Sequence, residues 1–198
     1  AFKIASFEIV DLPLIRYVAS KGKPMIISTG MADADEIDEA VQAARNGGCQ
    51  DIALLHCVSG YPAPAEDYNL RTLVDMADRF GLVTGLSDHT LDNTTALASV
   101  ALGGCLVEKH FTLDRRAGGP DDSFSLEPRE LAHLCRSAKD AWAALGKVDY
   151  GLKASERSNV KFRRSIYVVS DVRRGEKVTM DNVRTVRPGF GLACKHLD

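Results

Sequence analysis

Two histidines, His89 and His110, each end an apolar segment of the sequence, VTGLSDH and GCLVEKH. Between them, NTTALASVALGG has apolar residues at helical spacing, which predicts a strand, a helix and a second strand. The carboxyl ends of parallel strands lie on one rim of an α/β fold, so we expect both imidazoles to face the same cavity. Asp88 and Glu108 lie close to them in the sequence, and this group of side chains indicates a metal site.

The composition is typical of a globular protein with one sizeable core. The chain has 198 residues, of which 45% are hydrophobic and 26% charged. A net charge of -2 gives no reason to expect nucleic-acid binding, and no apolar run approaches the roughly 20 residues that span a membrane. The cysteines form no CxxC pair, which favours reduced thiols, and no targeting segment is recognisable. We therefore expect a cytoplasmic protein without nucleic-acid or membrane partners.

Residues 1–146 alternate between apolar segments of strand type and helical patterns, at intervals of roughly 22 to 30 residues. The first of these strands is AFKIASFE, and the last helix begins at Pro128 and ends at Gly146. Continuous apolar strands separated by helices are typical of parallel βα units. Because a complete (β/α)8 barrel needs about 250 residues, this region predicts part of an α/β barrel.

The composition changes at Gly151. Residues 147–161 are polar and basic, which predicts a linker. Residues 162–198 contain short strand-like pieces, RSIYVVSD and VRTVRPGFG, separated by turn-rich sequence. We expect them to form a small β-rich module, and we expect that module to be incomplete.

A set of short motifs follows one order along the chain: KIASFE, IISTGM, LLHCVSGYPAP, GLSDHT, VEKHFTLD, GGPD, SLEP and RPGFG. In these motifs and their order, essentially the whole chain resembles the sialic acid synthase family. Within that family, SFEIVDLPLI, FRRSIYVV and RPGFGL look most similar to pseudaminic acid synthases. Phe7 carries much of this finer likeness, because N-acetylneuraminate synthases more often have a glycine before the glutamate.

The resemblance implies a (β/α)8 TIM barrel followed by a small antifreeze-like (SAF) domain, in a domain-swapped homodimer. On that template the chain corresponds to barrel strands four to eight and most of the SAF domain. Strands one to three, which carry a further family glutamate and a phosphate-binding lysine, have no counterpart in the sequence. We therefore expect a fragment that is not fully active by itself.

The activity that the resemblance implies is condensation of phosphoenolpyruvate with an open-chain N-acetylated amino sugar. For the pseudaminic branch the sugar is 2,4-diacetamido-2,4,6-trideoxy-L-altrose, and the products are a nine-carbon 2-keto acid and phosphate. A divalent metal held by His89 and His110 would polarise the aldehyde oxygen. The family favours Mn2+, with Mg2+ or Co2+ as alternatives. A carboxylate must activate the water that adds to C2, and Glu8 and Glu108 are both candidates.

The phosphate and carboxylate of phosphoenolpyruvate require cations and hydroxyl or backbone donors at strand ends. Residues of these types match family positions for this role at the ends of three predicted strands: Lys3, Ser6, Ser28 and Ser87. A single serine there could merely cap the following helix, so the prediction depends on their joint placement.

The resemblance also implies the residues that hold the sugar. Asp121 in GGPD matches a family position that binds sugar hydroxyls, and Tyr61 in YPAP can stack on the sugar or donate a hydrogen bond to it. Arg187 in RPGFG matches an arginine that reaches the N-acetyl group in the partner subunit's site. Phe7 would make the floor of the site more apolar, as suits a deoxy sugar.

Three alternatives stay open from the sequence. An N-acetylneuraminate or legionaminic acid synthase would differ only in its sugar. A metal-dependent aldolase on a similar barrel would use pyruvate and release no phosphate. A non-catalytic carbohydrate-binding or assembly module would bind sugar or self-associate without turnover, because a fold alone does not determine function.

Overall fold

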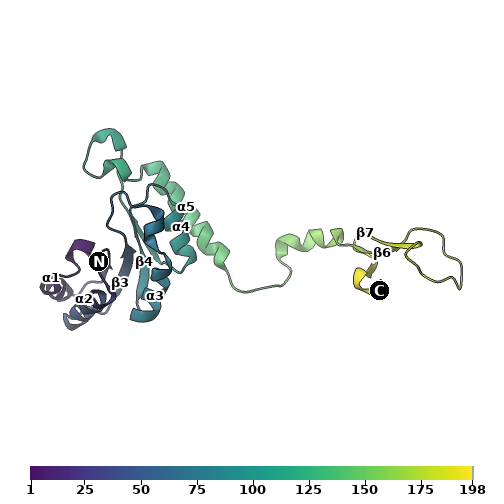
Figure 1. The fold of residues 1–198 in the computed structure, drawn as a ribbon, viewed down its shortest axis with the longest axis horizontal. Coiled ribbons are helices and arrows are strands. Elements are labelled where there is room, and N and C mark those ends of the chain that lie inside the picture. The colour runs from purple at the N-terminus through teal and green to yellow at the C-terminus, as the bar shows by residue number, and fades with distance from the viewer. Residues whose placement is uncertain (198) are drawn as a thin grey trace. The chain divides into compact units, whose positions relative to one another are not determined.

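Five parallel strands form the main sheet, in the same order as in the sequence (Figure 1). They are β1 Phe2–Ile4, β2 Met25–Ser28, β3 Ile52–Cys57, β4 Val83–Asp88 and β5 Leu106–Lys109. A doubly wound sheet reverses its strand order, whereas the wall of a barrel does not. The expected parallel βα units are therefore confirmed, with the strand order of a barrel wall.

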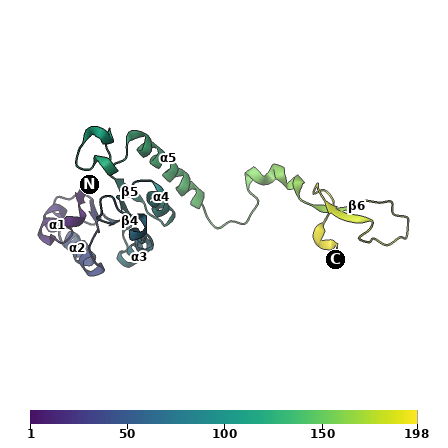
Figure 2. The same cartoon turned by 45° about the horizontal axis from the view of Figure 1, so that its top comes forward.

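The computed structural model describes residues 1–197, and the chain divides after Gly146 into two compact units. The first unit contains the parallel sheet and its helices: α1 Leu12–Ala19, α2 Ala34–Asn46, α3 Arg71–Phe80, α4 Thr94–Ala101 and α5 Pro128–Leu145. Figure 2 shows these helices following the curve of the sheet, from α1 and α2 at one end to α4 and α5 at the other. None of the helices within residues 1–197 is long and apolar enough to cross a membrane.

Local sequence signals fix where the helices begin. The Asp11 carboxylate accepts a hydrogen bond from the Leu14 amide at the start of α1. Asp33 and Glu36 form a reciprocal capping box at the start of α2, in which each side chain accepts from the other residue's backbone. The buried faces of α1 and α2 then pack on β1 to β3 in the largest hydrophobic core, which holds the strand ends in place.

The first strand is shorter than AFKIASFE suggests. β1 ends at Ile4, and Ser6–Glu8 forms a 3-10 turn, η1, instead of continuing the strand. The Glu8 carboxylate accepts a hydrogen bond from the Ala5 amide at 2.8 Å, which closes the turn. This local bond satisfies a backbone donor that a longer strand would have paired with its neighbour.

Short 3-10 turns also occur in three loops of the first unit, namely η2 Ala65–Tyr68, η3 Arg115–Ala117 and η4 Asp122–Phe124. The second unit begins at Lys147. It contains η5 Ala154–Phe162, η6 Cys194–His196 and an antiparallel sheet of β6 Ser165–Val168, β7 Val183–Val186 and β8 Leu192–Ala193. Part of the segment 147–161 is therefore helical, and the last residue of the expected module, Asp198, lies outside the described residues.

Candidate active site

His89 follows the last residue of β4 and is held by hydrogen bonds of its backbone and of its ring. Its amide donates to the hydroxyl of Tyr68 at 2.7 Å, and its Nδ1 lies 2.7 Å from the carbonyl oxygen of Val58. Since a carbonyl oxygen can only accept, we infer that Nδ1 carries the proton and that Nε2 keeps its lone pair. Tyr68 is completely buried in η2, a position that gave no signal of this role in the sequence.

His110 follows β5 in the same way and lies beside His89. The two ring centroids are 5.2 Å apart. Nδ1 of His110 lies 3.3 Å from a carboxylate oxygen of Asp121, which also acts as an acceptor. His110 therefore has the same tautomer as His89, with Nε2 free to bind a ligand.

This donor set fits a divalent metal. Histidines that bind metals usually donate their second ring N–H to a carbonyl or carboxylate, as both His89 and His110 do. Within residues 1–197, no group of three or more His, Cys, Asp or Glu side chains is placed to surround one ion. Two imidazoles would therefore leave the other coordination positions to water and substrate oxygens.

Two further aromatic rings pack against the histidines. The Tyr61 ring centroid lies 4.3 Å from that of His89 and 5.8 Å from that of His110. Phe124, in η4, lies 5.0 Å from His110 and 5.7 Å from Tyr61. Phe124 is buried and was missed in the sequence, although an aromatic residue three positions after Asp121 could have indicated it. The four rings form one wall that orients the imidazoles.

Lys3, Ser87 and Glu108 form a polar group at the ends of β1, β4 and β5. The Glu108 carboxylate accepts a hydrogen bond from the Ser87 hydroxyl at 2.8 Å, and the Lys3 ammonium lies 3.2 Å from the same oxygen. Both charged side chains are partly exposed, so a ligand can reach them. The group combines a cation, a hydroxyl and a carboxylate in one place.

A second cluster of hydroxyl groups surrounds Gly30. The Ser6 hydroxyl accepts a hydrogen bond from the Gly30 amide at 3.1 Å. Ser28 and Ser59 have buried hydroxyl oxygens that lack a hydrogen-bond partner among the described residues. A Cβ atom at Gly30 would lie 2.3 Å from the Ser59 hydroxyl and 2.8 Å from that of Ser6, so any other residue there would displace these hydroxyls. Ser59 was missed in the sequence, and it extends the set of hydroxyls available to an anion.

Other predicted residues lie in η1 or in the second unit. Glu8 caps the Ala5 amide in η1, and the neighbouring Phe7 is 65% exposed. Phe7, with Val10 and Met31, lines a hollow of about 230 Å³ that Ser6 and Gly30 also border. Arg187 directly follows β7 in the second unit.

The other three histidines have different surroundings. His56 lies near the end of β3, where its Nε2 contacts the Tyr68 carbonyl, and His133 is exposed on α5 beside Ser137. His196 lies in η6 of the second unit. The contact of His56 with Tyr68 nevertheless connects β3 to the residue that holds His89.

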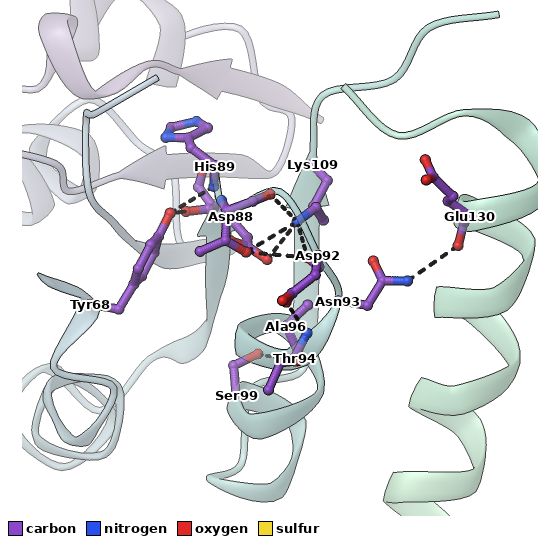
Figure 3. Close-up of polar contacts among 12 residues, drawn as sticks. Tyr68, Asp88, His89, Asp92, Asn93, Thr94, Ala96, Ser99, Lys109 and Glu130 are labelled. Atoms are coloured by element: carbon purple, nitrogen blue, oxygen red, sulfur yellow. Dashed lines mark hydrogen bonds and ion pairs between the residues drawn. The ribbon is translucent and has the colours of Figure 1, made fainter. Parts of the chain in front are cut away.

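A buried ion pair joins the residues that precede the two histidines. Lys109 Nζ lies 2.9 Å from the Asp88 carboxylate, and both side chains are almost completely buried. Figure 3 shows Lys109 at the centre of a polar network below His89. A lysine before a histidine gives no sign of burial in the sequence, because its partner comes from another strand.

The two imidazoles differ in their acid–base behaviour. Burial lowers the pKa of His89, but the neighbouring Cys57 and the hydrogen bond to Val58 together outweigh burial and raise that pKa. At His110, burial and the charge of His89 lower the pKa. His110 therefore releases its proton first as the pH rises, and both rings must be neutral before they can bind a metal.

A model of the NeuB family matches residues 1–150. The chain belongs to the NeuB family. This membership confirms the resemblance to sialic acid synthases that the motifs indicate.

Two NeuB relatives match nearly the whole chain. An N,N'-diacetyllegionaminic acid synthase of Campylobacter jejuni is 42% identical over 98% of this chain and 59% of its own length. A pseudaminic acid synthase of Helicobacter pylori is 38% identical over 98% of this chain and 57% of its own length. These names differ in their sugar product, so relationship alone does not single out one substrate.

A solved structure supports the fold assignment of this NeuB chain. It is an N-acetylneuraminic acid synthetase from Leptospira borgpetersenii in complex with citrate, which is 35% identical with a TM-score of 0.73. The match covers 81% of this chain and 56% of that one. The chain thus spans less than two thirds of the length of the relatives it matches.

Proposed function

We propose that this chain is part of a sialic-acid-type synthase that condenses phosphoenolpyruvate with the open-chain aldehyde of an N-acetylated amino sugar. One observation carries the proposal: the ring centroids of His89 and His110 lie 5.2 Å apart, and each Nδ1 faces an oxygen acceptor, which leaves Nε2 as the nitrogen that can bind a metal. Membership of the NeuB family supports the same chemistry. The chain spans less than two thirds of the length of these relatives, so the activity is proposed for the protein as a whole.

The first step forms a bond between C3 of phosphoenolpyruvate and the aldehyde carbon. The chemistry that a bound divalent metal supplies is Lewis-acid polarisation of the aldehyde oxygen, and we expect Mn2+, with Mg2+ or Co2+ as alternatives. His89 and His110 would hold the metal through Nε2. Tyr61 and Phe124 exclude water from one side of the imidazoles by packing on them.

Phosphoenolpyruvate needs several donors because it carries both a phosphate and a carboxylate. Lys3 would supply the cation, and the buried hydroxyls near Gly30 would donate hydrogen bonds at close range. The proposed set of donors from the strand ends is Lys3, Ser6, Ser28, Ser59 and Ser87. The unpaired hydroxyls of Ser28 and Ser59 support this role, because a bound anion would satisfy them.

The second step adds water to C2 and releases phosphate by cleavage of its C–O bond. A carboxylate takes the proton that the water loses. Glu108 is the better placed of the two candidates, because Lys3 and Ser87 hold it on the rim. Glu8 remains the second candidate, since its carboxylate would first have to leave the Ala5 amide.

For the sugar we propose 2,4-diacetamido-2,4,6-trideoxy-L-altrose, the precursor of pseudaminic acid. Phe7 supports this choice, because its apolar side chain lies beside Ser6 and Gly30, where phosphoenolpyruvate is proposed to bind. An apolar side chain suits a sugar that lacks one hydroxyl group. The precursor of legionaminic acid is the second candidate, favoured by the 42% identity to the Campylobacter jejuni enzyme. Asp121 and Tyr61 would contact the sugar from beside His110 and His89.

The second unit is proposed to be the antifreeze-like domain of a domain-swapped homodimer. Lys and Arg outnumber Asp and Glu from Lys147 onward, whereas the acids outnumber the bases before it. Opposite charges of this kind favour association between units of different subunits. Arg187 would then contact the N-acetyl group in the partner's site. The free cysteines support a reducing compartment, and we propose the cytoplasm.

The test is phosphate release with Mn2+, using phosphoenolpyruvate labelled with 18O in the C–O–P bridge. The 198-residue chain and the same chain extended upstream would each receive the altrose sugar, the legionaminic precursor or N-acetylmannosamine. We expect turnover in the extended chain with the altrose sugar, label in the released phosphate, and loss of activity with EDTA. Label retained in the keto acid would contradict C–O cleavage.

The same experiment separates the other possible functions. Turnover of pyruvate without phosphate release would identify an aldolase. Sugar binding by both chains without any turnover would identify a non-catalytic module, and the proposed reaction would then be wrong.

A further inference from the structure

The Asp88–Lys109 ion pair is among the most buried charged groups of the first unit. The exposed fractions of the two side chains are 0% and 3%, and their charged atoms lie 2.9 Å apart. Burying two charges costs more than burying apolar side chains of similar size, unless further hydrogen bonds satisfy both groups. A contribution to the stability of β4 and β5 therefore does not by itself explain why this ion pair is buried.

Lys109 uses its other donors on the loop that contains His89. Its Nζ donates to the carbonyl oxygen of Thr90 at 2.8 Å and to that of Asp92 at 2.7 Å. Figure 3 labels Lys109 and Asp92 in this network. The other oxygen of Asp88 accepts from the Thr90 amide at 2.9 Å. His89 therefore lies between Asp88, which is one partner of the ion pair, and Thr90, which is hydrogen-bonded to both partners.

The register of the strands brings both histidines under the same constraint. Asp88 and Lys109 are opposite each other at the last rung of the β4–β5 ladder, and His89 and His110 are the next residues. Side chains alternate between the faces of a sheet, so this pair lies on the face opposite to Ser87 and Glu108. By the same alternation, His89 and His110 lie on the face of Ser87 and Glu108, where the substrates are proposed to bind.

The β4–β5 ladder ends where the histidines begin. Beyond it, the His89 carbonyl accepts a hydrogen bond from the Ala63 amide and the His110 carbonyl accepts one from the Leu126 amide, but neither bond joins β4 to β5. Beyond the last rung the ion pair ties the Thr90–Asp92 loop of β4 to β5, and Tyr68 supports the His89 amide from the other side. A metal site of two imidazoles tolerates little change in the separation of the rings. Groups that orient ligands in this way typically change metal affinity about 10- to 100-fold when they are removed.

We propose that the Asp88–Lys109 ion pair is the positioning device of the metal site, which sets the orientation of both imidazoles through the residues that flank them. This inference rests on the proposed role of His89 and His110 as metal ligands. Electrostatics alone makes the opposite prediction for one variant. Removing the positive charge of Lys109 near a bound cation should strengthen metal binding, whereas loss of positioning should weaken it.

The test compares Lys109→Met and Lys109→Gln with a double variant, Asp88→Leu/Lys109→Met, in the full chain. Lys109→Gln keeps hydrogen-bond donors without the charge and should fold most readily. The double variant replaces the pair by apolar groups, which restores stability in other buried pairs. Arg79→Met is the matched control, because it breaks an exposed ion pair with Asp75 on α3.

The measurements are the thermal unfolding temperature, the Mn2+ dissociation constant from calorimetry, and the imidazole 15N shifts of the metal-free protein. We expect Lys109→Met to bind Mn2+ about 10- to 100-fold more weakly, and Lys109→Gln to lie between it and the wild type. The double variant should regain thermal stability but keep the weak binding and lose the wild-type tautomer signal of His89. Arg79→Met should match the wild type in all three measurements.

Two results would overturn the inference. One is wild-type or tighter Mn2+ binding by Lys109→Met or Lys109→Gln. The other is a double variant with wild-type 15N shifts. If the wild type itself fails to bind Mn2+, the proposed metal role is wrong. The 15N shifts, measured without metal, would still decide whether the pair positions the rings.

Discussion

The two halves of the strand-end rim hold their polar side chains in different ways. At β4 and β5, His89, Lys109 and Asp88 all have protein partners. At β2 and β3, the hydroxyls of Ser28 and Ser59 are buried without a partner among the described residues. A buried polar group without a hydrogen bond costs stability, so its retention in a site favours binding of a ligand there.

This difference indicates a division of labour along one sheet. The β4–β5 half is preorganised, because its side chains are fixed before any ligand arrives. The β2–β3 half is completed by the ligand, which would supply the missing hydrogen-bond partners. Variants in the first half should therefore reduce the rate of reaction, and variants in the second half should reduce affinity for the anion.

The largest effect is expected at a metal ligand in the preorganised half. His110→Gln should lower kcat about 1,000-fold, because Lewis-acid polarisation contributes several kcal/mol to the stability of the transition state. Steady-state phosphate release measures this change. His133→Gln is the control, since His133 is exposed on α5, and it should keep the wild-type kcat. A comparable decrease of kcat in both variants would contradict the role of His110 as a metal ligand.

The next effect should appear in the half that the ligand completes. Gly30→Ala places a Cβ atom 2.3 Å from the Ser59 hydroxyl, which must move. Loss of one hydrogen bond to a charged ligand costs about 1.5–3 kcal/mol, so the KM for phosphoenolpyruvate should rise about 10- to 100-fold.

The control for that variant is Gly60→Ala, whose added Cβ would meet its nearest neighbours at 3.5 Å, an ordinary contact. Its KM for phosphoenolpyruvate should stay within about twofold of the wild type, because normal van der Waals contacts require no rearrangement. If Gly30→Ala lowers kcat and leaves KM unchanged, the anion does not bind at these hydroxyls.

Much of this arrangement could be predicted from the sequence. The strand–helix–strand spacing between His89 and His110 places both rings on one rim, and the structure brings them within 5.2 Å. The strand periodicity also predicts the parallel sheet. These features depend on local patterns, which a sequence displays directly.

The parts that were missed depend on contacts between distant segments. Tyr68 holds His89 through its hydroxyl, and Lys109 is buried because its partner Asp88 lies on another strand. Neither contact produces a periodic pattern of residues in the sequence. The end of β1 was missed for a local reason, because the Glu8 carboxylate closes a turn where the apolar pattern suggests a longer strand.

A smaller effect should separate stability from function within the second half. Ser28→Ala removes a buried hydroxyl without a protein partner, so the free energy of unfolding should rise by about 1 kcal/mol. The same variant should raise the KM for phosphoenolpyruvate about tenfold. Ser99→Ala is the matched control. The Ser99 hydroxyl donates to the Ala96 carbonyl at 2.7 Å, so its loss should destabilise the protein by about 1 kcal/mol. Equal destabilisation by both variants would show that Ser28 is already satisfied without a ligand.

The smallest effect concerns His56, which connects the two halves through Tyr68. Burial is the larger influence and lowers the pKa of His56, although the Tyr68 carbonyl opposes it. Between the lowered folded pKa and the unfolded value of about 6.5, the unfolded chain binds more protons than the folded one. The contribution of His56 to stability is therefore complete above about pH 6.5 and is lost as the pH falls through that window. Urea unfolding of wild type and His56→Gln from pH 5 to 8 should give a stability difference that shrinks toward acid pH. A difference that grows toward acid pH would mean that His56 is charged in the folded protein.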